Sequence, residues 1–108
     1  LKMATKDELY NQGLDLYGQG KHREAIAEYQ KALEIDPEDG EIYMAISMCY
    51  QMLGELDPAL EAARRAVDLS PREPLSYTNL SRVLVKKGMI PEAEEAMAIS
   101  RQLSMGYL

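Results

Sequence analysis

Two side chains in this 108-residue sequence could form a nucleophile–base pair, because Cys49 is the only cysteine and His22 the only histidine. A thiol becomes a catalytic nucleophile when an imidazole lies beside it. His22 follows a predicted turn at Gly20, whereas Cys49 falls inside a later predicted helix, and nothing in the pattern brings them together. We therefore interpret His22 as a packing or surface residue and Cys49 as a small buried hydrophobe. The sequence predicts a non-enzymatic protein.

The acidic residues do not form a recognisable metal site. The segment from Asp36 to Glu41, DPEDGE, resembles a calcium loop in composition but lacks the ligand spacing. We interpret it as a turn between helices. Glu92, Glu94 and Glu95 are expected in the first turn of the last helix, where they offset the positive end of the helix dipole. One cysteine excludes a multi-thiolate metal centre, so we expect no cofactor and no metal.

The charge balance is acidic, with 12 Lys plus Arg against 18 Asp plus Glu and a formal net charge of −6. Nucleic-acid binding needs a basic face, so no nucleic acid is expected, and single-stranded RNA binding is the alternative that this charge disfavours. No apolar run is long enough to span a bilayer, so no membrane insertion is expected. Without a signal-peptide pattern, the expected location is cytoplasmic.

The strongest signal is an internal repeat of 34 residues. Gly20, Gly54 and Gly88 have this spacing. Large, small and aliphatic residues recur with the same period at Leu9/Tyr43/Tyr77, Gly13/Ser47/Ser81, Ala25/Ala59/Ala93, Ala32/Ala66/Ser100 and Ile35/Leu69/Leu103. The sequence therefore predicts one domain over 1–108 with repeat units at about 6–39, 40–73 and 74–107.

Each unit is predicted to form two helices joined by a tight turn at its glycine. We expect Asp57 to cap the fourth helix, with Pro58 in its first turn. The predicted helices cover 6–18, 22–35, 41–53, 58–69, 74–87 and 91–104.

Small residues at fixed positions indicate how the helices pack. Gly13 and Ala25 allow two antiparallel helices to approach closely, while Leu9 and Tyr29 fill the space around that contact. Ala32 leaves room for the next unit. Because one hairpin cannot bury its own apolar faces, neighbouring hairpins must stack. The predicted fold is all-α, a short right-handed superhelix of three antiparallel helix pairs, with the first helix of each pair lining a concave side.

The stretch GKHREAIAEYQKALEIDP, together with the period of 34, resembles the tetratricopeptide repeat family. The resemblance implies an α-solenoid that acts as a scaffold for protein–protein contacts. The third unit departs from the family pattern, with Met105 at the closing proline and Arg101 at an aliphatic position. These departures imply either that the third unit is terminal or that the chain is cut at this point, and the capping helix common in the family is missing from this sequence.

We predict that ligands bind the concave side of this fold. Met44, Met48 and Met52 recur every four residues and share one stripe of a helix, a flexible apolar surface. The alternative is that part of this stripe packs against neighbouring helices. The complete predicted lining is Tyr10, Leu14, Tyr17, Met44, Met48, Gln51, Met52, Thr78, Asn79, Arg82 and Val85.

One subgroup of the family binds the C-terminal carboxylate of heat-shock chaperones through a clamp of Lys, Asn, Asn, Lys and Arg. The corresponding residues here do not match this clamp, and most of them are apolar. They are Tyr10, Leu14, Ala45, Leu75 and Asn79. The resemblance therefore implies a partner with an apolar peptide segment or helix rather than a chaperone carboxylate.

Two functions follow as hypotheses. The first is an adaptor or scaffold module that binds an apolar peptide or helix in its groove. The alternative is a self-assembly module that forms homo-oligomers through its uncapped last repeat, because exposed apolar surface tends to find a partner. The residues expected on that surface are Met97, Ile99, Leu103, Tyr107 and Leu108.

Overall fold

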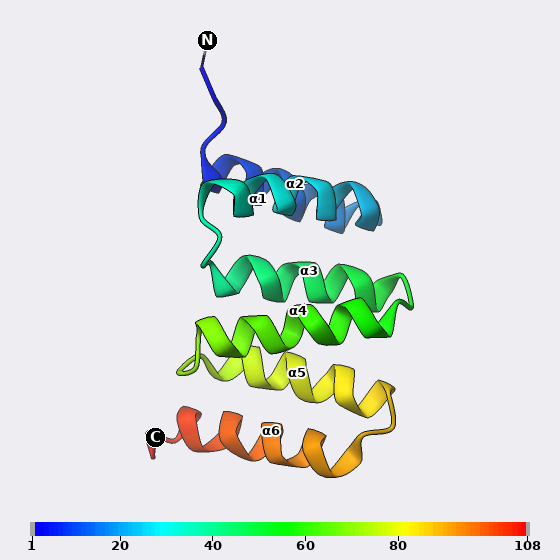
Figure 1. Ribbon diagram of the computed structural model, residues 1–108, viewed down its shortest axis with the longest axis vertical. Coiled ribbons are helices and arrows are strands. Elements are labelled where there is room, and N and C mark those ends of the chain that lie inside the picture. The colour runs from blue at the N-terminus through cyan, green and yellow to red at the C-terminus, as the bar shows by residue number, and fades with distance from the viewer. Residues whose placement is uncertain (1, 108) are drawn as a thin grey trace.

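The computed structural model describes residues 2–107, which contain six α-helices and no strand. The helices stack in chain order along the longest dimension, and each runs antiparallel to the one before it (Figure 1). Their bounds are α1 Lys6–Gly18, α2 His22–Ile35, α3 Gly40–Met52, α4 Leu56–Leu69, α5 Pro74–Lys86 and α6 Ile90–Ser104. The stack measures 49 × 29 × 19 Å. The predicted all-α superhelix of three helix pairs is confirmed.

The turn inside each helix pair has one geometry. Gly20 has a φ of 78°, a left-handed conformation that favours glycine. The amide of Lys21 donates to the carbonyl of Leu16 at 2.9 Å, and the amide of Gly20 donates to that of Tyr17 at 3.0 Å. This pair of bonds is the Schellman motif, which satisfies the free carbonyls at a helix end. Equivalent turns at Gly54 and Gly88 close the other two pairs.

The first helix of each pair has a side-chain cap at its N-terminus, whereas the second helix has none. Asp39 caps α3 by accepting from the amide of Ile42 at 3.2 Å. The prediction that Asp57 caps α4 is wrong. That helix begins two residues earlier, at Leu56, because the Gly54 turn leads directly into it, and Asp57 and Pro58 lie within its first turn. Proline is tolerated there because the first amides of a helix have no intrahelical acceptor.

The close approach of α1 and α2 at Gly13 is confirmed. A Cβ atom at Gly13 would lie 2.3 Å from Cε1 of Tyr29, whose side chain is 1% exposed. Ala25 and Ala32 are fully buried on the same helix as Tyr29. Glycine at position 13 therefore makes the space that the tyrosine ring fills.

The seam between the second and third helix pairs contains a buried polar network. Gln51 donates through Nε2 to Oδ1 of Asn79 at 2.8 Å, and Asn79 donates through Nδ2 to Oγ of Ser47 at 3.1 Å. Ser47 donates in turn to the carbonyl of Ala59 at 2.8 Å. The seam between the first and second pairs has different residues at the equivalent positions, 34 residues earlier. They are Gly13, Tyr17 and Ala45.

Among the helices in residues 2–107, none is both long enough and apolar enough to cross a bilayer.

Candidate functional site

An apolar hollow lies between the first and second helix pairs, on the side formed by α1, α3 and α5. Its volume is about 190 Å³. Tyr10, Leu14 and Tyr17 come from α1, while Met44 and Met48 come from α3 and lie one helical turn apart. Tyr29 and Ala45 complete the lining. We call this hollow the inner pocket.

The inner pocket is half-open to solvent. Leu14 is 44% exposed, and the side chains of Tyr10, Tyr17, Met44 and Met48 are half-buried. Tyr10 packs against Tyr29 with ring centroids 5.7 Å apart. A half-buried wall of aromatic rings and thioethers leaves apolar area that a ligand can cover.

The third methionine of the stripe lies elsewhere. Met52 is 59% exposed at the end of α3 and does not line the inner pocket. The predicted stripe therefore divides into two residues that form a pocket wall and one that lies on open surface.

Two predicted lining residues require correction. Asn79 is 2% exposed and Gln51 is 9% exposed, because both belong to the polar network between α3 and α5. Their amides are occupied with each other and with Ser47. They stabilise the seam and offer no free surface for a ligand.

The remaining predicted residues lie on α5, away from the inner pocket. The hydroxyl oxygen of Thr78 lies 2.8 Å from that of Ser100, so Thr78 contributes to the contact of α5 with α6. Arg82 is exposed and lines none of the hollows described here. Val85 is 53% exposed and borders a different hollow.

That hollow, of about 380 Å³, lies at the far end of the stack on α5 and α6. Val85, Ile90 and Met97 supply its apolar wall, and Glu94 and Arg101 its charges. Its lining residues are the third-repeat equivalents, two periods of 34 later, of residues in the first pair. Those first-pair residues are Gly13, Tyr17, His22, Ala25, Ile26, Tyr29 and Leu33. Leu103 and Ile99 are half-buried and Tyr107 is 73% exposed, while Leu108 lies outside the described residues.

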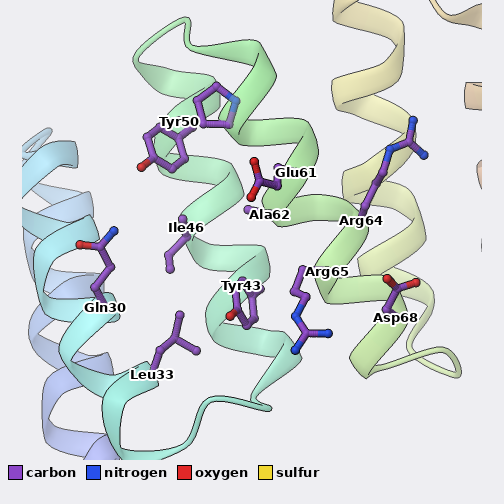
Figure 2. Close-up of a pocket in the computed structure, with 11 residues that line it drawn as sticks. Gln30, Leu33, Tyr43, Ile46, Tyr50, Glu61, Ala62, Arg64, Arg65 and Asp68 are labelled. Carbon is purple, nitrogen blue, oxygen red and sulfur yellow. The ribbon is translucent and has the colours of Figure 1, made fainter.

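Another hollow, of about 580 Å³, lies on the opposite face of α3, between α2 and α4 (Figure 2). Tyr43, Ile46 and Tyr50 form its floor, and the guanidinium carbon of Arg65 lies 5.7 Å from the centre of the Tyr43 ring. The sequence analysis did not predict this hollow.

One pair of repeat positions distinguishes this outer hollow from the corresponding face between α4 and α6. Between α4 and α6, Arg64 forms two hydrogen bonds with Glu92, at 2.9 and 3.0 Å. The residues 34 positions earlier, between α2 and α4, are Gln30 and Pro58, which cannot form an ion pair. This substitution is the sequence signal that could have revealed the outer hollow.

The residues considered for catalysis serve in packing. Cys49 is fully buried, which raises the pKa of its thiol to about 11. His22 meets the Tyr17 ring edge-on, with centroids 5.0 Å apart. Between residues 2 and 107, no three His, Cys, Asp or Glu side chains are placed to hold a metal ion.

The sequence profile of the tetratricopeptide repeat matches residues 10–74 of this chain, which is more than half of its length. The chain belongs to the tetratricopeptide repeat family. The resemblance seen in the sequence is thereby confirmed.

Curated members of the tetratricopeptide repeat family resemble this chain over part of their length. The Hsp70-Hsp90 organizing protein of Triticum aestivum is 31% identical over 91 residues, which are 84% of this chain and 15% of the wheat protein. The photosystem I assembly protein Ycf3 of Synechococcus sp. (strain CC9902) is 34% identical over 86 residues, covering 77% of this chain and 50% of that protein. This chain thus spans less than two thirds of these relatives.

Solved tetratricopeptide repeat structures share the fold. The Yersinia enterocolitica secretion chaperone SycD, in complex with a peptide of the translocator YopD, has a TM-score of 0.84 at 24% identity, covering 90% of this chain and 74% of that one. The second repeat domain of Spaghetti (RPAP3), bound to the HSP90 peptide SRMEEVD, has a TM-score of 0.87 at 16% identity, covering 92% of both chains. At such identities the likeness establishes the fold alone.

Proposed function

We propose that this chain is a non-enzymatic adaptor that binds an apolar segment of a peptide or helix in the inner pocket. The observation that carries the proposal is the half-exposed apolar wall formed by Leu14, Met44 and Met48 between α1 and α3. Its support from relatives is that SycD and RPAP3, which share the fold, were solved with bound peptides.

The expected affinity is modest. Covering five apolar side chains contributes roughly 8–15 kcal/mol at about 1.5–3 kcal/mol each. Association and ordering cost roughly 4–15 kcal/mol. Near the middle of both ranges the two contributions almost cancel, so we expect a micromolar or weaker complex, which suits a transient adaptor.

The test uses a fluorescein-labelled peptide of sequence Ser-Leu-Gln-Met-Gln-Leu-Ser and measures fluorescence anisotropy. Met48→Glu and Leu14→Glu each place a charge against the apolar wall, so each should weaken binding by at least about tenfold. Ile35→Glu is the matched control, because Ile35 is 54% exposed at the end of α2, outside the pocket. Helix content is checked by circular dichroism. The same affinity in the wild type and in both pocket variants would refute the proposal.

A second candidate function is self-assembly through the hollow on α5 and α6. The favouring observation is that its lining residues occupy the repeat positions of the surface against which α3 packs in the first pair. A helix from a second copy could therefore dock there. Sedimentation should show a concentration-dependent dimer that Ile90→Glu removes and Ile35→Glu leaves intact. A monomer at high concentration would exclude this function.

A further inference from the structure

A second hollow, of about 280 Å³, adjoins the inner pocket. The two share Tyr10 and Met44 as common wall residues. The second hollow adds two carboxylates, Glu41 and Glu73, and the side chain of Leu75, which is 62% exposed. Ser70 and Ser76 complete its lining. We call it the acidic rim of the inner pocket.

Lys6, which borders a neighbouring hollow together with Glu41, does not neutralise the acidic rim. Nζ of Lys6 lies 3.0 Å from a carboxylate oxygen of Asp36 and 3.0 Å from one of Asp39, so this cation is already shared by two anions. Within residues 2–107, neither Glu41 nor Glu73 forms an ion pair. Glu73 accepts one hydrogen bond, from the amide of Leu75 at 3.2 Å.

The Glu41 carboxylate lies beside the hydroxyl of Tyr10, at the boundary between the two hollows. Burial raises the pKa of Tyr10 to about 12, and the neighbouring negative charge of Glu41 adds to this effect. The tyrosine consequently remains neutral at physiological pH, and the negative charge at this boundary belongs to the carboxylates.

We propose that the groove selects peptides in which a lysine or arginine lies close to the apolar side chain held by the inner pocket. The methylene stem of such a residue would pack on Met44 and Leu75, while its charged head meets Glu41 and Glu73. An acidic ligand would instead meet the two carboxylates of the acidic rim. This inference rests on the proposed function, because it names the chemistry of the ligand for the same site.

The experiment compares three labelled peptides of equal length and equal apolar pattern, Ser-Leu-Xaa-Met-Xaa-Leu-Ser, in which Xaa is Lys, Gln or Glu. A partly exposed ion pair changes affinity by about 1.4-fold to 5-fold. With two carboxylates, the Lys peptide should bind about 2-fold to 25-fold more tightly than the Gln peptide, and the Glu peptide most weakly. The acidic peptide SRMEEVD should behave like the Glu peptide. The preference for Lys should shrink as salt is raised.

Glu41→Gln is the informative variant, because Glu41 forms no cap, whereas Glu73 caps α5. It should reduce the preference for Lys over Gln by about 1.4-fold to 5-fold. Glu34→Gln is the matched control, since Glu34 is an exposed carboxylate on α2 outside both hollows. It should preserve the preference.

The outcomes separate this inference from the function on which it rests. Equal affinities for the three peptides, or tightest binding of the Glu peptide, would overturn the charge selection and leave the adaptor function standing. Absence of binding by all three peptides would overturn both. A Glu41→Gln variant that keeps the full preference for Lys would show that the acidic rim does not select the ligand by its charge.

Discussion

Replacing Gly13 with alanine should destabilise the first helix pair, although alanine is the better helix former. The added Cβ would lie 2.3, 2.7 and 2.8 Å from three atoms of the Tyr29 ring. Carbon atoms in contact prefer about 3.5–4.0 Å, so the ring would have to move by more than an ångström. Tyr29 is 1% exposed and packed against Tyr10, which leaves it little room.

The magnitude follows from two opposing effects. Overpacking of this kind costs about 1–3 kcal/mol, while removing a glycine from a helix contributes about 1 kcal/mol of stability. Because three ring atoms are involved, we expect the upper part of the range and a net loss of about 2 kcal/mol. That loss corresponds to a fall in melting temperature of about 8–16 °C.

The assay is urea and thermal unfolding followed by circular dichroism, with Gly18→Ala as the matched control. A Cβ at Gly18 meets no atom within 4 Å, so this variant should be at least as stable as the wild type. Equal stability of the two variants would refute the steric argument.

A double-variant cycle tests the same contact independently. The second pair has Ser47 and Ala63 at the positions of Gly13 and Tyr29. Gly13→Ser combined with Tyr29→Ala should therefore cost less than the sum of the single variants, by about 1–3 kcal/mol. A strictly additive result would mean that the two positions do not constrain each other.

Three further predictions concern residues described above. Asn79→Leu removes the shorter of the two hydrogen bonds donated by Nε2 of Gln51, which keeps only its 3.4 Å bond to Oγ of Ser47. It should lower the unfolding free energy in urea by about 1–3 kcal/mol; an unchanged midpoint would contradict the network. Arg64 holds the pKa of Glu92 below its ordinary value, so this ion pair stabilises the fold above about pH 4.3 and is lost as pH falls through the lowered pKa. The stability curves of wild type and Glu92→Gln should consequently converge at acidic pH, and parallel curves would exclude the linkage. The Cys49 thiol should resist Ellman's reagent at pH 8 in the folded protein and react fully in urea; rapid labelling without denaturant would contradict its burial.

The repeat in the sequence predicted the helices well, because glycine and proline mark their ends by backbone geometry alone. The exception at α4 is instructive. The capping rule favoured Asp57 before Pro58, but the register of 34 residues places the start of α4 at Leu56, equivalent to His22 in α2 and Ile90 in α6. The repeat was therefore the better guide, since the same turn fixes the first residue of each closing helix.

The candidate site was less predictable, because periodicity assigns a residue to a face but not to a partner. Gln51 and Asn79 lie on the predicted face, but they are hydrogen-bonded to each other across the seam and are therefore buried. The outer hollow escaped prediction because its walls come from α2, α3 and α4, and periodicity does not show whether side chains of different helices meet. Both features depend on pairs of residues in different repeats.

The two seams of the stack differ in how firmly they fix the relative orientation of their helix pairs. Directional bonds between Ser47, Gln51 and Asn79 lock the second pair to the third. At the first seam, the equivalent interior residues are a glycine, a tyrosine ring and an alanine, whose contacts tolerate small rotations. For the proposed ligand site, this means that the α3 wall of the inner pocket would be held by the third pair, whereas the α1 wall could shift to accommodate apolar side chains of different size.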